Sequence, residues 1–344
     1  MNQAPTHTRQ VRIMVTKKTR GAVALVVAAA LSSLAACGGD GDTVVEENAD
    51  GTTSITVATV ASDSGSQAFY ADSLGFFEDQ GLEVTVKVVA NVPDLAAAVE
   101  SGDAQFALTS PTSVASASTA GINFRIVAGG AIYTVDNPGV WIMVPAGQDG
   151  ITSVDDLEGK SIAVNALNTM PHLSTLATLD DAGVDVDSIN SVTLDFTQVG
   201  QAFESNQVDA ATVTAPFNYQ IESDGIGTTM LSPYDAVNNG EDFYNTIWFG
   251  EQGFIDSNPE VVDTFRAAIA ETNAWANDPA NEDERKAILQ EVTSLTDATM
   301  EDMQLLLFDD EVSPEMIQPL MDLMERFEVL PQPVDAASII AGTD

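Results

Sequence analysis

The sequence predicts an α/β protein of two lobes, each a mixed, largely parallel sheet flanked by helices, and three observations support this fold class. Short alternating apolar segments typical of strands are separated by longer segments with helical spacing. This order of strands and helices runs through the chain twice. The segments ESGDAQFA (100–107) and ESNQVDAA (204–211) resemble one another, and each is soon followed by a proline. About 290 residues beyond position 53 suffice for two domains.

The first series begins with the strand pattern SITVATV (54–60). A helix is expected from 67 to 81, because apolar residues recur there with helical spacing and the segment ends on glycine. A strand (82–90), a helix (92–102) and a third strand (104–110) follow. Strands that alternate with helices in this way form βαβ units, whose strands pair in parallel.

The second series opens at Lys160 and repeats the order. Its strands are expected at 160–166, 189–195 and 209–215, and its helices at 171–183 and 197–207.

The C-terminal part adds one strand and several helices. TIWFGEQGFI (246–255) has a strand pattern. Asn258 and Pro259 form a strong helix start, a cap followed by proline at the first helical position. The last clear amphipathic helix lies in 313–330, and its apolar face includes Met316, Leu320, Met324 and Phe327. Core packing is the expected role of that face.

Residues 1–36 have the layout of a secretory signal peptide. They contain five bases and no acid, and they end in an apolar run closed by small residues. That run is shorter than the roughly 20 apolar residues of a membrane-spanning helix. Met14 is an alternative start, because the segment after it also supplies a charged region. Cys37, the only cysteine, follows in LAAC (34–37), so an internal disulfide is impossible.

The LAAC segment resembles the bacterial lipobox. This resemblance implies cleavage before Cys37 and lipidation of its thiol, whereas a signal peptide cut nearby would leave an ordinary thiol. The segment 37–53 is rich in Gly, Asp and Glu, which predicts a flexible acidic tether. We therefore expect a folded body held by a lipid anchor at the outer face of the cell membrane.

The charge of the chain excludes several partners. Beyond residue 36, seven bases remain against 52 acids, a formal charge of −45. Nucleic-acid binding needs a basic stripe, and docking on anionic lipid needs basic residues, so we expect neither. Self-repulsion destabilises a compact state unless salt screens it. We therefore predict a salt-adapted, halophilic protein whose melting temperature rises steeply with added salt.

Four segments resemble one known family when they are taken together in order and spacing. They are SLGFFEDQGLEVTV (73–86), AAAVESGDAQFAL (96–108), DLEGKSIAVN (156–165) and QVDAATVTAP (207–216). They are similar to the substrate-binding lipoproteins of ABC importers in the nitrate, sulfonate, taurine and pyrimidine-precursor group. The resemblance extends from Ile55 to about Val334, and the lipobox strengthens it.

The resemblance implies a type II periplasmic-binding-protein fold, in which two lobes joined by a two-strand hinge close on a ligand. It places the first lobe at 54–133 and 234–344 and the second at 134–233, after a signal peptide (1–36) and a tether (37–53). The implied function is an extracytoplasmic receptor that captures a small polar organic solute or oxyanion. It would deliver this solute, as a monomer, to an ABC permease with its ATPase.

Ligands of open α/β sheets bind beyond the carboxyl ends of the strands, where helix N-termini offer unpaired N–H groups. Four loops of this kind follow predicted strands, two in each series: 61–67, 109–113, 165–172 and 214–219. Ordinary turn and cap roles are the alternative for each polar residue there. The predicted ligand-binding residues are Ser62, Asp63, Gln67, Ser110, Thr112, Asn165, Asn168, Thr169, Phe217 and Trp248, and Tyr133 and Tyr219 are further candidates for flat apolar walls.

None of the seven remaining bases falls in these loops. An anionic ligand would therefore depend on hydroxyl groups and helix N-termini, which can hold a sulfonate. Asp63 slightly favours a neutral or amine-bearing ligand.

Catalytic motifs are missing from the sequence. EGKS (158–161) has Val154 where a phosphate-binding loop needs glycine, and it precedes a strand instead of following one. His172, the only histidine beyond residue 36, can touch ligand, although a surface or helix-end position is favoured. A soft-ligand metal site or a Cys–His nucleophile would need further histidines or cysteines. We predict no catalytic residue, metal or cofactor.

Two other functions remain open. A lipoprotein of this build could sense its solute without transporting it. The resemblance also extends to pyrimidine-synthesising enzymes of the same fold, which bind pyridoxal phosphate through histidine and cysteine residues. Those enzymes are cytosolic and lack a lipobox, so the signal peptide and the missing residues weigh against this alternative.

Overall fold

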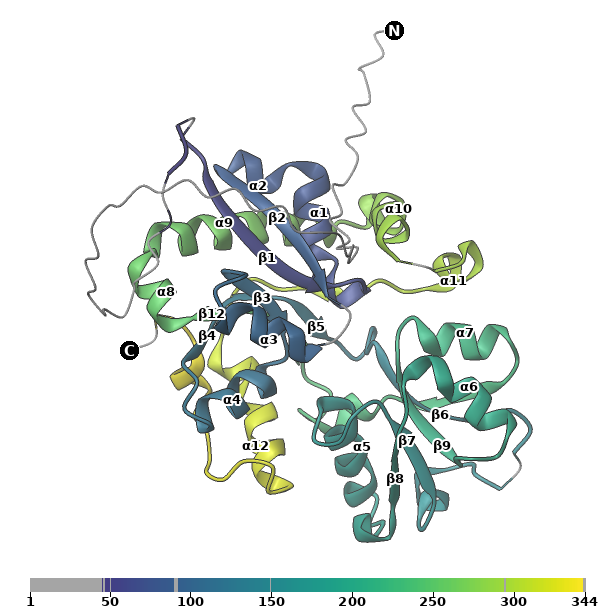
Figure 1. The fold of residues 1–344 in the computed structure, drawn as a ribbon. Coiled ribbons are helices and arrows are strands. Elements are labelled where there is room, and N and C mark those ends of the chain that lie inside the picture. Colours follow the sequence, from purple (N-terminus) through teal and green to yellow (C-terminus); the bar gives the residue numbers. More distant parts are fainter. Residues whose placement is uncertain are drawn as a thin grey trace, which may run out of the picture.

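The computed structural model describes residues 45, 47–49, 51–89, 92–148, 150–293 and 295–342. The predicted signal peptide, Cys37 and most of the predicted tether lie outside the described residues. The described part forms two five-stranded sheets, each covered by helices, and a three-stranded sheet between them (Figure 1). The prediction of an α/β protein with two lobes is confirmed.

The first sheet has the strand order β2-β1-β3-β12-β4. β1 pairs in parallel with β2 and β3, whereas β12 inserts antiparallel between β3 and β4. The sheet is therefore mixed, as predicted. Its strands are β1 (Thr53–Val60), β2 (Leu82–Val89), β3 (Phe106–Thr109), β4 (Phe124–Gly129) and β12 (Ile247–Glu251).

Helices cover both faces of the first sheet, and the side chains of β1 alternate between them. Val57 packs in the cluster with Phe77 and Phe265, and the next residue, Ala58, packs in the cluster with Leu95 and Leu320. The first face carries α1 (Gln67–Leu74), α2 (Phe76–Asp79), α8 (Gln252–Ser257) and α9 (Pro259–Ala276); the second carries α3 (Val92–Glu100), α4 (Pro111–Thr119) and α12 (Gln318–Arg326).

Two helix predictions need correction. The single helix expected at 67–81 is divided into α1 and α2 by Gly75, whose φ of 82° places it in the left-handed region and ends α1. The helix start at Asn258 and Pro259 is confirmed for α9, but the Asn258 side chain does not cap it. Instead, Asn258 Nδ2 donates to the Phe254 carbonyl, and Asn258 Oδ1 accepts from the Val45 N–H.

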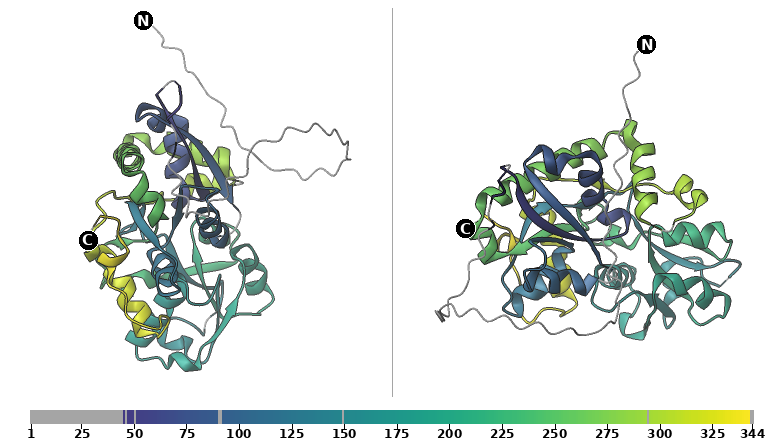
Figure 2. Two further views of the ribbon diagram at one scale, coloured as in Figure 1. Left: turned by 60° about the vertical axis from the view of Figure 1, so that its left-hand side comes forward. Right: turned by 45° about the horizontal axis from the view of Figure 1, so that its top comes forward.

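The second sheet has the order β10-β6-β9-β7-β8. β7 pairs in parallel with β8 and β9, and β6 is antiparallel to both β9 and β10. Its strands are β6 (Val140–Pro145), β7 (Ser161–Val164), β8 (Asn190–Thr193), β9 (Ala210–Thr214) and β10 (Gly227–Leu231), and its helices are α5 (Met170–Asp181), α6 (Phe196–Glu204) and α7 (Phe217–Ser223). In both views of Figure 2 this teal lobe lies to one side of the purple and green elements of the first lobe.

The two lobes are joined by two crossing segments, as predicted. β5 (Ala131–Tyr133) leads out of the first lobe, and β11 (Phe243–Tyr244) pairs antiparallel with it on the way back. The structure adds a third strand, β13 (Leu307–Phe308), which pairs with the other edge of β5. The domain limits 54–133, 134–233 and 234–344 stay predictions.

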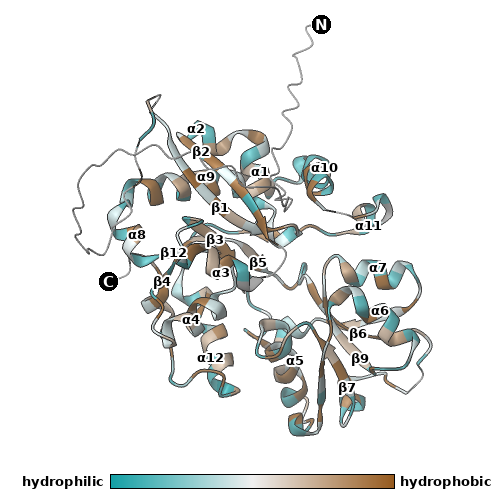
Figure 3. Cartoon of the chain, viewed as in Figure 1, coloured by the Kyte–Doolittle hydropathy of each residue, from teal (hydrophilic) through white to brown (hydrophobic). Residues whose placement is uncertain are grey.

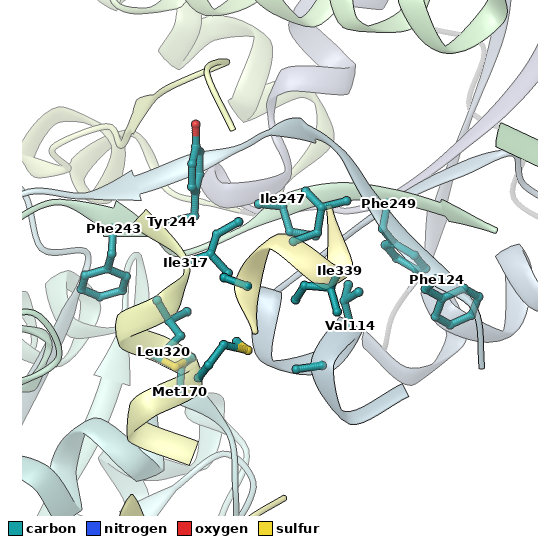
Figure 4. Close-up of a cluster of buried hydrophobic side chains, with 14 of the residues drawn as sticks. Val114, Phe124, Met170, Phe243, Tyr244, Ile247, Phe249, Ile317, Leu320 and Ile339 are labelled. Carbon is teal, nitrogen blue, oxygen red and sulfur yellow. The ribbon is translucent and has the colours of Figure 1, made fainter. Parts of the chain in front are cut away.

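One apolar cluster extends from the first lobe across the hinge. It contains Met170 and Leu173 of α5 together with Leu320 and Met324 of α12 (Figure 4). Leu320 and Met324 are fully buried, so the predicted core role of this Met-containing face is confirmed. Figure 3 shows the same division in both lobes, with apolar strands inside and polar helix faces outside.

Two further α-helices and several short 3-10 turns complete the described chain. A short turn at Pro233–Ala236 connects β10 to β11 and contacts α5. After α9 the chain forms α10 (Glu282–Val292) and α11 (Asp297–Asp302) before β13. No helix in the described ranges is long and apolar enough to cross a membrane.

Candidate functional site

Strand directions place all four predicted loops at the edges nearest the hinge. In the first sheet, β1 and β3 run parallel to β4, whose carboxyl end leads directly into β5 of the hinge. In the second sheet, β6 enters from the hinge, and the parallel strands β7 and β9 run towards it. Loops 61–66 and 110–113 of one lobe therefore face the same region as loops 165–169 and 214–217 of the other.

Hydroxyl groups gather at the start of α4. Ser110 lies at the N-cap, and its Oγ is 2.7 Å from Thr112 Oγ1 and 3.0 Å from Ser113 Oγ. The Ser113 N–H donates to Ser110 Oγ at 3.4 Å, a long capping bond. Thr112 is buried, Ser110 is half-buried and Ser113 is exposed, so this group offers donors and acceptors at a helix N-terminus.

The loop after β7 supplies amides and a hydroxyl at the start of α5. Thr169 Oγ1 donates to the Ala166 carbonyl at 2.8 Å and lies 3.4 Å from Asn165 Oδ1. Asn168 has a φ of 60°, in the left-handed region that asparagine tolerates, and its side chain is exposed. Thr169 occupies the N-cap without capping the helix, which leaves the first N–H groups of α5 without a side-chain partner from this residue.

His172 has a structural role in the same loop. Its Nδ1 accepts from the Asn168 N–H at 3.0 Å, and its Nε2 lies 3.2 Å from Ser191 Oγ. Burial lowers the pKa of His172, which favours the neutral ring. In that state Nε2 carries the proton and donates to Ser191. Both ring nitrogens are thus occupied. His172 lies at the start of α5, as the helix-end alternative expected, but it is buried and not on the surface.

Two predicted ligand-binding residues, Gln67 and Trp248, lie in the core instead. Both are fully buried. The Trp248 indole N–H donates to Gln67 Oε1 at 2.9 Å, and Gln67 Nε2 donates to Asn273 Oδ1 at 2.5 Å. The Trp248 ring packs against Phe265. The sequence placed them at a strand end, but their side chains point into the first lobe, and neither presents a surface to a ligand.

Asp63 also differs from its predicted role as a polar loop tip. It is 3% exposed, and its Oδ2 accepts from the Leu306 N–H at 2.7 Å. Burial raises its pKa to about 6, against the opposing effects of nearby Arg285 and of the Leu306 N–H. Its neighbour Ser62 is half-buried, with Oγ 3.0 Å from Ser64 Oγ. Ser62 therefore stays at the interlobe edge, whereas Asp63 turns inward.

The aromatic candidates are divided between two environments. Tyr133 is fully buried, stacks on Phe243 and donates its hydroxyl to Asp235 Oδ1, so it belongs to the hinge. Phe217 is half-buried and packs against Phe196 of α6 at 5.5 Å between ring centroids.

Tyr219 is half-buried and has contacts on both sides of the interlobe region. Its ring contacts Trp141 of β6, and its hydroxyl oxygen accepts from the Gln304 N–H.

Two asparagines at the interlobe edge were missed. Asn137 and Asn218 are buried, and Oδ1 of each has no hydrogen-bond partner. Asn137 precedes β6, and Asn218 is the second residue of α7. The NPG turn at 137–139 and the NY pair after Pro216 were visible in the sequence. The sequence did not show that β6 runs antiparallel to its neighbours. This direction brings the start of β6, and Asn137 before it, to the interlobe edge.

Apart from Arg285, which is buried near Asp63, the basic residues beyond position 36 lie away from the four loops. Lys87 pairs with Asp103, Lys286 with Glu282, and Arg326 with Asp180 and Asp181. The guanidinium groups of Arg125, Arg266 and Arg285 donate to backbone carbonyls, and Lys160 precedes β7 at the far edge of its sheet. The described residues contain no group of three or more His, Cys, Asp or Glu that could hold a metal ion.

One surface hollow lies elsewhere. It has a volume of about 440 Å³ on the first lobe and is lined by residues of β4, α9 and the C-terminal segment, including Arg266 and Asp310. A second hollow of about 250 Å³ lies over α6. Neither contains a predicted ligand-binding residue, and the strand-end loops remain the candidate site because they combine both lobes.

A family model described as NMT1/THI5 like matches residues 66–282, more than half of the chain. The chain belongs to the NMT1/THI5-like family. The matched region includes the whole second sheet, every strand of the first sheet except β1, and three of the four loops in full, so the resemblance found in the sequence is confirmed.

Relatives of this chain are named as binding proteins, and the name of one refers to an ABC transporter. The taurine-binding periplasmic protein of Escherichia coli K12 is 26% identical over 237 residues, which cover 66% of this chain and 70% of that protein. A Brachyspira hyodysenteriae protein named among the ABC transporter periplasmic binding proteins is 28% identical over 123 residues, 36% of this chain. The match spans only 34% of that relative's length.

Solved structures show the same fold. The aliphatic sulphonate binding protein SsuA of Escherichia coli has a TM-score of 0.69 at 17% identity, covering 83% of this chain and 97% of SsuA. The nitrate-binding protein NrtA of Synechocystis PCC 6803 has a TM-score of 0.65 at 13% identity, covering 83% of this chain and 84% of NrtA. At these identities the likeness establishes the periplasmic-binding-protein fold.

Proposed function

We propose that this protein is a solute receptor of an ABC importer, which holds a small polar organic solute or oxyanion between its lobes without altering it. One observation carries the proposal: hydroxyl- and amide-bearing loops from both sheets face one another at the hinge edge. Ser62 and the Ser110 group belong to one lobe, and Asn165, Asn168 and Thr169 belong to the other. A ligand bound by both sets would favour lobe closure.

The proposed binding set is revised by the geometry. It keeps Ser62, Ser110, Thr112, Asn165, Asn168, Thr169 and Phe217, and it adds Asn218. Gln67 and Trp248 leave the set because they are buried against each other, and Asp63 leaves it because its carboxylate binds the Leu306 N–H. With basic side chains located elsewhere, an oxyanion would be held by neutral dipoles, and a zwitterion or neutral solute fits equally well.

A location at the outer face of the cell membrane completes the proposal. Cys37 would carry the lipid, and the acidic segment 37–53 would let the monomeric body reach an ABC permease with its ATPase. Mass spectrometry of protein from native cells tests the anchor. A diacylated or triacylated Cys37 at the new N-terminus is the expected result, and an unmodified thiol would contradict it.

Thermal-shift screening tests the solute. Unlipidated protein (Cys37→Ser) is heated in molar salt with taurine, alkanesulfonates, nitrate, pyrimidine precursors or flavins. A solute at 100 times its dissociation constant stabilises the fold by about 2.7 kcal/mol. If no solute shifts the transition while the protein turns over a substrate, the receptor function is wrong and an enzyme on this fold replaces it.

A matched pair of variants locates the site once a solute shifts the transition. Thr169 and Thr119 each donate a hydroxyl to the carbonyl three residues earlier, at 2.8 and 2.9 Å. Both are half-buried, but Thr169 lies in an interlobe loop, whereas Thr119 lies at the far end of α4. Thr169→Ala is expected to weaken binding about three- to tenfold, the loss of one hydrogen bond. Thr119→Ala is expected to leave binding unchanged.

A further inference from the structure

The segment 304–306, between α11 and β13, touches both lobes outside the two crossing strands. We call it the strap. It is continuous with β13, which pairs with β5 of the hinge. α11, which precedes the strap, lies against α7 of the second lobe (Figure 1).

The first lobe holds the strap through buried charged groups. Asp63 Oδ2 accepts from the Leu306 N–H, and one terminal nitrogen of Arg285 donates to the Leu306 carbonyl, both at 2.7 Å. Asp63 and Arg285 are 3% and 4% exposed. The Arg285 guanidinium also lies over the rings of Tyr70 and Phe308. Hydrogen bonds to charged groups are about twice as strong as neutral ones, so this attachment is firm.

The second lobe holds the strap through neutral groups. The Gln304 N–H donates to the Tyr219 hydroxyl at 3.2 Å, and Gln304 Nε2 donates to the Asp136 carbonyl at 3.1 Å. Asn137 Nδ2 donates to the Leu305 carbonyl at 2.5 Å. Gln304 is exposed, and Tyr219 is half-buried. The two Gln304 bonds are exposed, so water can replace their partners at little cost, whereas the Asn137–Leu305 bond is buried.

This asymmetry indicates which attachment separates when the lobes move apart. A rotation about β5 and β11 moves Asp136, Asn137 and Tyr219 with the second lobe, whereas Asp63 and Arg285 keep the strap on the first. We propose that the strap is a latch and that Tyr219 and Gln304 are positioning residues which set the balance between open and closed forms. The inference rests on the proposed solute-receptor function, and it adds a contact outside the ligand site that tunes affinity.

The test measures the distance between the lobes without any solute. In full-length Cys37→Ser protein, which has no other cysteine, spin labels are attached at Glu100→Cys on α3 and Gln201→Cys on α6. Double electron–electron resonance in molar salt then gives the distance distribution. Tyr219→Phe removes the acceptor of the Gln304 N–H but keeps the ring. Gln304→Ala removes the separate bond to Asp136.

Each variant is expected to shift the ratio of closed to open forms about three- to tenfold towards the open form, and the double variant should combine both shifts. Gln252→Ala is the matched control, because Gln252 Nε2 donates at 2.7 Å to Asp256 within the first lobe. It should reproduce the parent distribution. Circular dichroism checks that each variant is folded.

Parent and latch variants with identical distributions would overturn the latch, and so would a parent that already populates widely separated lobes. Both results are independent of the solute screen. Failure of every solute with a working latch refutes only the receptor function, and a binding solute with an inert latch refutes only the latch.

Discussion

The two lobes touch at two places outside the crossing strands, and these contacts differ in kind. Near the hinge, α5 packs on α12 through a buried apolar cluster that includes Met170, Leu173 and Leu320. Near α7, the strap meets the second lobe through hydrogen bonds of Gln304 and Leu305, and Tyr219 packs against a small apolar cluster that includes Leu305. Separating the first contact exposes apolar surface at about 25 cal/mol per Å², whereas the second exchanges neutral hydrogen bonds for water.

Because the two contacts differ, the lobes can move relative to one another while the core stays intact. The α5–α12 contact is part of the core and is expected to persist while helices slide by small amounts. The strap contact can open and reform. The following four predictions test this division, beginning with the largest expected effect.

Leu320→Ala is expected to destabilise the protein by about 2–5 kcal/mol, because it leaves a cavity in the cluster shared by α5 and α12. The free energy of unfolding is measured with denaturant in molar salt. Leu307→Ala is the matched control, since Leu307 is 36% exposed in β13 whereas Leu320 is fully buried. Equal losses for the two variants would show that the α5–α12 contact is not part of the core.

Asp63→Asn tests the buried attachment of the strap through the pH dependence of the free energy of unfolding. Because the pKa of Asp63 is raised from 3.8 to about 6, the folded state binds the proton more tightly than the unfolded state. Asp63 therefore adds stability below pH 3.8 that is lost as the pH rises through 6. At 1.36 kcal/mol per pKa unit, wild type should gain up to about 3 kcal/mol over Asp63→Asn between pH 7 and pH 4.

Unfolding free energies of both proteins across this pH range provide the measurement. Other groups, including His172, titrate in both proteins and cancel in the difference. A difference that stays constant with pH would contradict the buried position of Asp63.

Gly139→Ala tests the apolar part of the strap contact. Gly139 has a φ of 69°, and a Cβ there would lie 2.8 Å from Leu306 Cδ2. Gly159→Ala is a close control, because Gly159 has a φ of 70° with no atom within 4 Å of an added Cβ. Both variants incur backbone strain of about 1 kcal/mol. Gly139→Ala should cost roughly a further 0.5–1 kcal/mol, because Leu306 must leave its rotamer to make room. Equal unfolding free energies would show that Leu306 does not pack on Gly139.

Arg326→Ala should have the smallest effect. Arg326 bonds Asp180 and Asp181 at the exposed end of the α5–α12 contact. Surface ion pairs contribute about 0–1 kcal/mol and are screened by salt. The variant should lower the melting temperature slightly in dilute buffer and not at all in molar salt. A large loss that persists in salt would mean that charge, and not the apolar cluster, holds these helices together.

Much of the fold was predictable because parallel βαβ units leave a strong local pattern. The strands around SITVATV and KSIAVNA and the start of α9 were found where local periodicity and the Asn-Pro pair indicated them. β6 and β10 were not predicted. They enter the second sheet antiparallel, and nothing in the spacing of apolar residues reveals which neighbour a strand will choose.

The candidate site was less predictable than the fold. Loop positions follow from strand ends, and Ser110, Thr112 and Thr169 lie at helix starts as expected. The direction of a side chain within a loop depends on contacts with distant residues. Asp63 turns inward because Leu306, 243 positions later, offers its N–H. The Gln67 side chain is hydrogen-bonded to Trp248 and Asn273, which both lie about 180 or more residues away.

The insertion of β12 between β3 and β4 has a consequence for how the chain assembles during synthesis. All strands of the second sheet lie between Val140 and Leu231, so that lobe is complete as soon as this stretch has emerged. The first sheet must wait for Ile247–Glu251 before β3 and β4 acquire their shared neighbour. The lobe that begins the folded body is thus the later one to finish, and until β12 is added β3 and β4 each keep an unpaired edge.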